Sequence, residues 1–348
     1  MQSLQKQRIE YLDYLRIAMS FLVVTLHVVA QGIPEVSVDS YEWGILNFYN
    51  SISRIGVPVF VMISGAVFLD KEKEITIKQF YRKNVLRIVV ALLFWSFTYA
   101  VIDYVEGCSI MDAVYYFATG HYHLWFLYML LGLYVMMPVF RTINCNKEIR
   151  NYFLIISIVA TFFIPWVINI IRCFKPGAAS LGESVFLSLK LPVVGSFAAY
   201  FILGRYLEDR KKNYSISKLL LVWGVGLITT FLLSFLAAQR QGENCEWFYS
   251  NFSVNVLLCA TAMFLIFKQS YGKESRNRKL ASQISSYSFG IYLIHPAIIA
   301  ISIKYLNFVS TSFNPLIAIP LLSVMTWLIS LAITLIIKKI PIIGKFIV

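Results

Sequence analysis

The chain alternates long apolar stretches, free of Asp, Glu, Lys and Arg, with short polar segments. A helix needs about 20 apolar residues to cross the hydrocarbon core, and flanking charged side chains can reach back to the interface. Ten stretches meet this requirement when their flanks are allowed to extend to the interface. The pattern therefore predicts ten transmembrane helices, near residues 12–31, 46–69, 86–105, 122–141, 152–171, 186–206, 218–238, 249–268, 284–304 and 315–337.

Composition supports this interpretation. Hydrophobic residues make up 58% of the 348 residues, charged residues only 14%, and the mean hydropathy is +0.69. A soluble domain carries about 25% charged residues, and a water-soluble fold of this size cannot hide so much apolar surface. The five cysteines form no CxxC pair, so neither a zinc site nor a disulfide framework is indicated. We predict an all-α integral membrane protein, with one membrane domain over residues 1–348.

The net charge of +13 has an explanation in membrane topology. Ten spans place both termini on one side, and Lys and Arg collect in cytoplasmic segments. With the N-terminus in the cytoplasm, the inner segments hold 25 of the 31 basic residues and 9 of the 18 acidic ones, a balance of +16. The outer segments then hold 6 basic and 9 acidic residues, a balance of −3. Both termini are therefore predicted to be cytoplasmic, and nucleic acid is not expected as a partner.

Arg16 and His27 lie within the first predicted span, with Asp13 at its start. A charged or titratable group inside a membrane is costly, so each is a candidate functional residue. Arg16 and His27 are eleven positions apart, which places them within about 20° of one helix face and roughly 16 Å apart along it. We expect Arg16 near the inner surface and His27 about three turns further out on the same stripe. Structural roles remain open for both, as an interfacial cation and an interhelical hydrogen-bond partner.

All four histidines lie in or beside predicted spans. We expect His27, His121, His123 and Arg54, which lies in the second span, to converge on an outward-facing pocket. His295, in the ninth span, is expected mainly to pack. His121 and His123 are two positions apart, so they would point to different sides of a helix. No HExxH motif is present, and no metal site is predicted.

A second basic cluster, Arg82, Lys83 and Arg87, precedes the third span. Guanidinium and ammonium groups bind phosphates well, so the cluster is a candidate phosphate-binding patch. A solvated cluster that merely follows the positive-inside rule is the alternative. The chain has no GxxxxGK[ST] or GxGxxG loop, so a nucleoside triphosphate site has no support.

Five blocks of the chain together resemble the acyltransferase-3 family of integral membrane acyltransferases. The first carries the family's Arg-x10-His pattern, matched by Arg16 and His27, and the blocks follow the family's order across almost the whole chain. They are LDYLRIAMSFLVVTLH (12–27), SRIGVPVFVMISGAVFL (53–69), FYRKNVLRI (80–88), HLWFLYMLLGLYVMMP (123–138) and SYSFGIYLIHP (286–296). The chain resembles a stand-alone member without an extra soluble domain. It departs from relatives that place Arg-x-x-Arg in the basic loop.

The resemblance implies a fold of about ten spans in the bacterial cytoplasmic (inner) membrane. It implies transfer of an acyl group, most often acetyl, from a cytoplasmic coenzyme A thioester to a hydroxyl of an outward-facing acceptor. Such acceptors are cell-envelope polysaccharides and lipid-linked sugars. Acetyl-CoA would be a co-substrate and not a tightly bound cofactor, and a homo-oligomer is possible. A branch of similar proteins is thought to move amino acids, so a transporter or flippase that uses the same cavity without acyl chemistry is the alternative.

The same resemblance suggests roles for individual residues. The coenzyme A diphosphate would bind near Arg16 and the basic cluster, that is, Arg82, Lys83 and Arg87. His27 would act as the general base, and Arg54 or His123 would stabilise the tetrahedral oxyanion. Trp125 would line a platform for a sugar, although packing against lipid or protein is the alternative for this ring.

Overall fold

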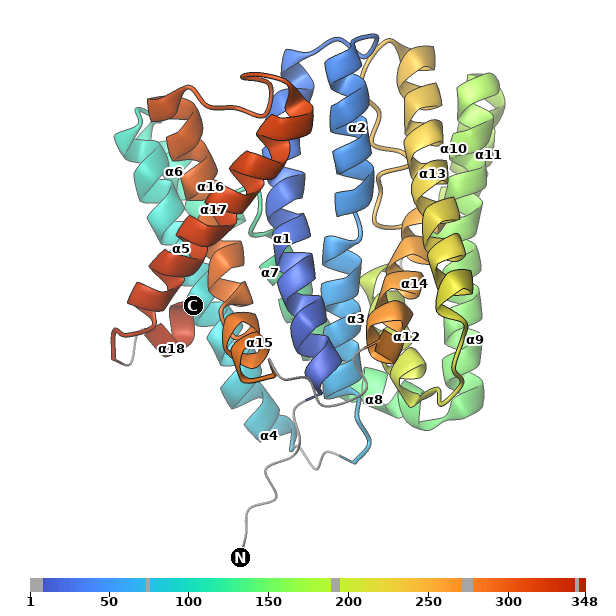
Figure 1. Cartoon of the computed structure of the whole chain (residues 1–348). Coiled ribbons are helices and arrows are strands. Elements are labelled where there is room, and N and C mark those ends of the chain that lie inside the picture. The colour runs from blue at the N-terminus through green and yellow to red at the C-terminus, as the bar shows by residue number, and fades with distance from the viewer. Residues whose placement is uncertain (1–8, 73–75, 189–194, 271–277, 342–343) are drawn as a thin grey trace, which may run out of the picture.

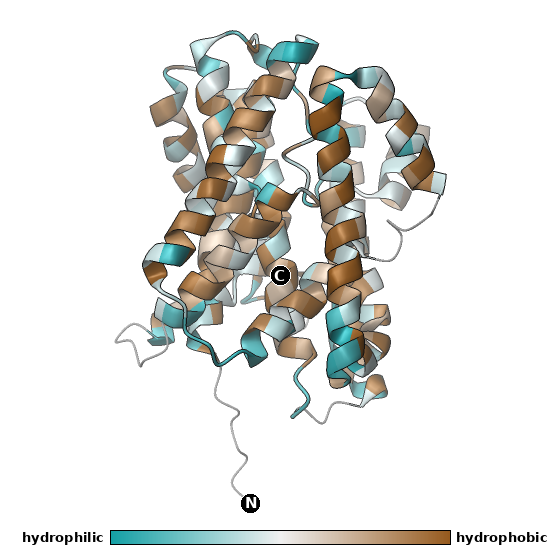
Figure 2. Ribbon diagram, turned by 90° about the vertical axis from the view of Figure 1, so that its right-hand side faces the viewer, coloured by the Kyte–Doolittle hydropathy of each residue, from teal (hydrophilic) through white to brown (hydrophobic). Residues whose placement is uncertain are grey.

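The computed structural model describes residues 9–72, 76–188, 195–270, 278–341 and 344–348. These residues form helices and loops and contain no strand, which confirms the predicted all-α class. The helices form a bundle in which the long axes run roughly side by side (Figure 1). Hydrophobic residues cover the middle of the long helices, while hydrophilic residues gather mostly towards the two ends of the bundle (Figure 2).

The elements of the first half of the chain alternate long helices with short broken ones. They are α1 (Glu10–Gly32), the 3-10 turn Ile33–Glu35, α2 (Tyr41–Ser53), α3 (Gly56–Phe68), α4 (Ile77–Phe80), the π-helical turn Tyr81–Val85, α5 (Leu86–Val105), α6 (Ile110–Thr119), α7 (Trp125–Val135) and α8 (Met137–Cys145).

The second half continues in the same manner. Its elements are α9 (Lys147–Ser157), the π-helical turn Ile158–Phe163, α10 (Ile164–Phe174), α11 (Pro176–Ser188), α12 (Ser196–Asp209), α13 (Ile216–Gln241), α14 (Val254–Ser270), α15 (Arg278–Ser285), α16 (Ser288–Leu306), α17 (Pro315–Ile337) and α18 (Gly344–Ile347).

Seven helical stretches are long and apolar enough to cross a membrane, and each overlaps one of the predicted spans. They are Glu10–Glu35, Tyr41–Phe68, Ile77–Val105, Lys147–Phe174, Ile216–Gln241, Ser288–Leu306 and Pro315–Ile337. The chain is therefore a multi-pass membrane protein.

The other three predicted spans are not single long helices. The predicted span 122–141 corresponds to α7 and α8, which are bent by 56° where they meet. The predicted span 249–268 corresponds to α14, a helix of 17 residues. The predicted span 186–206 falls on the end of α11, on residues outside the described part, and on the 14-residue helix α12. The count of ten remains a prediction.

One of the seven stretches is interrupted at Arg54 and Ile55, between α2 and α3. Pro58 explains the break, because it has no backbone N–H to donate to the carbonyl of Arg54 one turn earlier. The interruption places the Arg54 side chain inside the bundle, about half-way along the combined helix.

Helices α3 and α12 touch at their backbones, and two glycines permit this approach. A Cβ atom added to Gly65 would lie 1.7 Å from the carbonyl oxygen of Phe201, and one added to Gly204 would lie 2.0 Å from that of Met62. The contact is reciprocal, since each glycine faces backbone of the other helix. Small residues of this kind let membrane helices pack closely, where van der Waals contact drives association.

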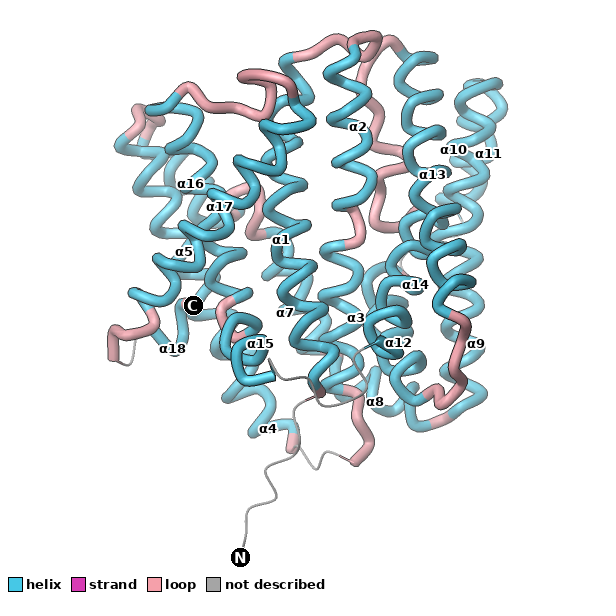
Figure 3. The backbone as a smooth tube through the Cα atoms, viewed as in Figure 1, coloured by secondary structure: helices cyan, strands magenta, loops and turns pink. Residues whose placement is uncertain are grey.

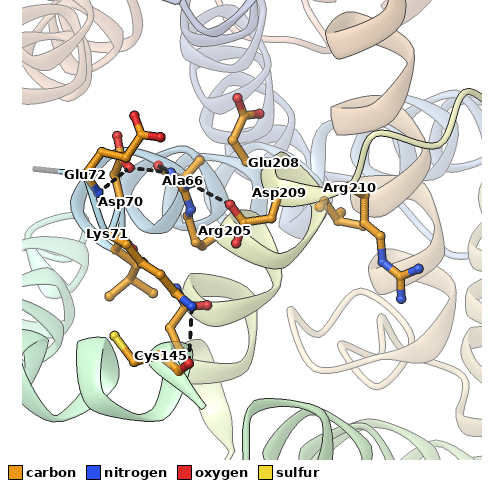
Figure 4. A network of polar contacts seen from close by, with 12 residues as sticks. Ala66, Asp70, Lys71, Glu72, Cys145, Arg205, Glu208, Asp209 and Arg210 are labelled. Atoms are coloured by element: carbon orange, nitrogen blue, oxygen red, sulfur yellow. Dashed lines mark hydrogen bonds and ion pairs between the residues drawn. The ribbon is translucent and has the colours of Figure 1, made fainter. Parts of the chain in front are cut away.

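A polar cluster continues this contact at the ends of α3 and α12 (Figure 4). The Arg205 guanidinium donates to the carbonyl of Ala66 at 3.2 Å and forms ion pairs with Asp70 at 3.4 Å and Asp209 at 2.5 Å. Arg150, at the start of α9, pairs with the other oxygen of Asp209 at 3.5 Å. The cluster ties three helices together at the end of the bundle where α1 begins, which we call the N-terminal end.

We expect the N-terminal end to face the cytoplasm, because this orientation puts 25 of 31 basic residues inside. A reporter that is active only outside the membrane should be silent when fused after Val348 and active when fused after Gln241, at the end of α13. Activity at Val348 or silence at Gln241 would reverse the orientation.

Candidate functional site

All four histidines of the chain lie in one cluster. His27 of α1 and His295 of α16 face each other, with 3.1 Å between His27 Nδ1 and His295 Nε2 and 4.8 Å between the ring centroids. His123 packs edge-on against His295 at 5.8 Å, and its Nδ1 lies 2.9 Å from Nδ1 of His121. The sequence does not reveal the contact between His27 and His295, because the two residues are 268 positions apart.

The hydrogen bonds around His27 assign its tautomer. His295 Nδ1 lies 3.2 Å from the carbonyl of Ile291, which can only accept, so this nitrogen carries the hydrogen. In a neutral ring Nε2 of His295 is then an acceptor, and its neighbour His27 Nδ1 must donate. His27 Nδ1 also lies 2.8 Å from the carbonyl of Val23, which requires the same donor. The lone pair of His27 is therefore on Nε2, where it is available to take a proton.

The placement of His121 and His123 differs from the prediction. We expected the two side chains to point apart, because they were taken to lie on a helix. They lie instead in the turn that precedes α7, and this turn brings their rings together. Tyr99 of α5 stacks on His121 at 4.4 Å, and the Tyr292 hydroxyl donates to the carbonyl of His123. Within the described residues, no group of three or more His, Cys, Asp or Glu side chains is arranged to hold a metal ion.

A cavity of about 520 Å³ leads from the N-terminal end of the bundle towards this cluster. Its lining residues come mainly from α1, α3, α5, α7 and α16. The deep part is apolar, with Val57, Phe60 and Phe126 among its walls. Two lining residues connect it to the histidines. Val23 accepts the hydrogen bond from His27, and Tyr292 donates to the backbone of His123.

The mouth of the cavity is cationic. Arg16, Arg87 and Lys338 line the cavity, together with Asn84 and four serines, whereas its described lining contains no Asp or Glu. Asp13 forms an ion pair with Arg16, with 3.1 Å between Asp13 Oδ1 and Arg16 Nη1. A mouth with three cations is suited to an anion, and guanidinium groups in particular suit phosphate.

Each of these cations is held by a neighbouring element. Arg87 donates to the carbonyl of Val348 at 2.9 Å and lies 5.2 Å from the centre of the Phe289 ring. Lys338, which follows α17, donates to the Ser286 hydroxyl at 3.1 Å. Lys338 was not predicted from the sequence, because only the packing of α17 against α16 brings it here.

The other two members of the basic cluster lie elsewhere. Arg82 and Lys83 belong to the π-helical turn that precedes α5, and both are exposed. Neither lines the cavity, whereas Arg87, one turn further on, does. The wider π turn adds a residue to the local repeat, so the faces of Arg82 and Arg87 cannot be related by the spacing of a regular α-helix.

The residues predicted for the outward-facing pocket separate into two groups. His123 is buried beside His295, and Arg54 lies two residues before Gly56, which packs against Val23 of α1. Trp125 does not join the cluster. Its ring is 42% exposed and packs against Phe197 at 5.7 Å.

The comparisons with known proteins address the family directly. The comparison with curated proteins gave no match, and neither did the comparison with solved structures. The family model described as an acyltransferase domain, Acyl_transf_3, matches residues 9–335. This range contains Arg16, the histidine cluster and most of the cavity lining. The chain therefore belongs to the acyltransferase-3 family of integral membrane proteins.

Proposed function

We propose that the protein is a membrane O-acyltransferase that moves an acetyl group from cytoplasmic acetyl-CoA to a hydroxyl of an outward-facing acceptor. The observation that carries the proposal is the cavity, which has a cationic mouth and whose lining includes Val23 and Tyr292, the hydrogen-bond partners of His27 and His123. The family membership supports acyl transfer. We place the protein in the bacterial cytoplasmic membrane and infer a cell-envelope glycan or lipid-linked sugar as acceptor.

The charge distribution of the cavity suggests one orientation for the coenzyme A donor. The phosphates of coenzyme A would bind at the mouth, near Arg16, Arg87 and Lys338. The pantetheine arm would follow the apolar walls. Arg16 and His27 are separated by roughly 16 Å along α1, which is about the reach of such an arm. The thioester would then lie beside His27, with the thiol end of coenzyme A still joined to a cytoplasmic head group.

The chemistry uses His27 as the general base. Its Nε2 takes the proton of the acceptor hydroxyl while the hydroxyl oxygen attacks the thioester carbonyl. The tetrahedral intermediate collapses, the carbon–sulfur bond breaks, and the imidazolium returns the proton to the leaving thiolate. His295 is a positioning residue, because its hydrogen bond holds the His27 ring in the tautomer that leaves Nε2 free.

The proposal is tested by mass spectrometry of envelope glycans from a deletion strain and from the complemented strain. We expect the deletion to remove an acetyl increment that complementation restores. Glycans that are identical in both strains would contradict this acceptor class. Substrate movement by the purified protein without any acyl-CoA would favour a transporter instead.

Removing a mouth cation should weaken donor binding more than it affects folding. We expect Arg87→Ala and Lys338→Ala each to raise the KM for acetyl-CoA by about tenfold, the usual effect of losing a hydrogen bond to a charged group. Arg82→Ala and Lys83→Ala are matched controls, because they remove the same kind of charge from outside the cavity. The KM for acetyl-CoA is measured on each purified variant. Equal effects at all four positions would contradict a donor-binding role and indicate only the general positive-inside distribution of charge.

A further inference from the structure

The segment between α13 and α14, residues 242–253, carries a carboxylate to Arg54, at the interruption between α2 and α3. This segment runs from the far end of α13 down between α2 and α13 (Figures 1 and 3). Tyr249 anchors it, because its hydroxyl donates to the Asn47 side chain at 2.5 Å. Three residues earlier, the Glu246 carboxylate pairs with Arg54 at 2.8 Å. The segment thus reaches the interruption between α2 and α3.

Arg54 is held on three sides. Its Nε donates to the Asn50 side chain at 2.9 Å, its Nη2 pairs with Glu246, and its guanidinium lies 4.7 Å from the centre of the Tyr249 ring. The side chain is only 18% exposed, and Gly56, two residues further on, packs against Val23 of α1, whose carbonyl accepts the hydrogen bond from His27. A guanidinium that is buried this deeply requires a counter-charge, and Glu246 provides one.

Glu246 still has accessible acceptor capacity. Its side chain is 60% exposed, although it pairs with a buried cation. One oxygen faces Arg54, and the other makes only a long contact of 3.4 Å with Asn244. An ionised carboxylate has about four lone-pair positions, so hydroxyl groups of a ligand can be accepted while the ion pair stays intact.

We propose that Glu246 is a specificity-determining residue for the acceptor. One carboxylate oxygen holds Arg54 beside His27, and the other accepts a hydrogen bond from a hydroxyl group of the acceptor. This inference rests on the acyl transfer proposed above. Such a contact is charge-assisted and selects for molecules with a second hydroxyl next to the one that is acylated. Water makes no such two-point contact.

The chain offers a matched control pair. Arg172 of α10 and Glu183 of α11 form an ion pair at 2.6 Å, and Glu183 is 46% exposed. Arg172 also lies over an aromatic ring, with 5.2 Å to the centre of Trp247. Among the described contacts, none connects this pair to the histidine cluster. Glu183→Gln therefore makes the same chemical change as Glu246→Gln in an ion pair that borders the same segment but has no described contact with Arg54.

The experiment compares two acceptors of the acetyl group. Purified wild-type protein, Glu246→Gln, Glu246→Asp and Glu183→Gln receive acetyl-CoA with either envelope glycan extracted from the deletion strain or water alone. We expect Glu246→Gln to lower kcat/KM for the glycan by about tenfold more than it lowers the rate of hydrolysis, with the KM for acetyl-CoA unchanged. Glu246→Asp should recover part of the loss, and Glu183→Gln should match the wild type.

Two results would overturn the inference. One is a parallel fall of glycan transfer and hydrolysis in Glu246→Gln, which indicates a general structural role. The other is glycan transfer by Glu246→Gln at the level of Glu183→Gln. If the wild type transfers nothing from acetyl-CoA, the proposed function itself fails, and the acceptor role of Glu246 fails with it.

Discussion

His27→Ala is expected to abolish acyl transfer while the protein remains folded and inserted. General-base catalysis contributes about 10²–10⁴-fold to a rate, and His27 Nε2 is the lone pair that the hydrogen-bond network leaves free. The loss should appear in kcat, because the cationic mouth, where we propose that the donor binds, is about three helical turns away. Acetylated glycan is measured at matched membrane abundance, together with single-turnover kinetics on purified protein.

Thr25→Ala is the matched control on the same helix. Thr25 is buried, and its hydroxyl donates to the carbonyl of Phe21 four residues earlier, as His27 donates to Val23. We expect near-normal transfer from this variant. His295→Ala is not a neutral comparison, since His295 contacts His27. Full activity of His27→Ala would show that the general-base assignment is wrong, and His27→Gln resolves the case in which the alanine variant fails to accumulate.

A single methyl group at Gly65 or Gly204 is expected to prevent stable packing of α3 on α12. The new Cβ would lie 1.7 Å or 2.0 Å from a backbone carbonyl oxygen, which is far inside van der Waals contact. Backbone cannot move aside as a flexible side chain can, so we expect a cost at or above the upper end of the roughly 1–3 kcal/mol typical of overpacking. Thermal unfolding of the purified variants, or the fraction that survives extraction in detergent, measures the effect.

Gly44→Ala and Gly224→Ala are the corresponding controls. Both glycines lie within helices, α2 and α13, and an added Cβ meets nothing within 4 Å at either position. Alanine there should be neutral or stabilising by up to about 1 kcal/mol, because glycine loses more backbone freedom on folding. If Gly65→Ala were as stable as Gly44→Ala, the close approach of α3 and α12 would be contradicted.

Features that lie within one helix could be predicted from the sequence. Arg16 and His27 lie on one helix, so the helical repeat alone relates their directions. In the structure Arg16 and Val23 line one cavity, whereas His27 is not among its described lining residues and binds the Val23 carbonyl one turn further on. Long apolar helices such as α13 and α17 were predicted for the same reason, since length and composition are local properties.

Features that depend on irregular backbone or distant segments could not be predicted. The turn before α7 brings His121 to His123, although a helical repeat separates them. The π-helical turn before α5 leaves Arg82 exposed while Arg87 lines the cavity. His295 and Lys338 approach the site only through the packing of α16 and α17. The sequence around each residue does not indicate that it lies there.

The backbone contact between α3 and α12 limits which wall of the cavity can move. Gly65 of α3 packs on the backbone of Phe201 in α12, and Arg205 of α12 forms ion pairs with Asp70 and Asp209. We therefore expect α3 to stay in place against α12. Among the described contacts of α5, α7 and α16 with α3, none is a comparable contact between backbone atoms. If the nucleotide head group of the proposed donor needs more room, we expect α5, α7 or α16 to move away from α3, while α3 stays on α12. The side of the cavity that carries Ser64 is the stationary reference for that motion.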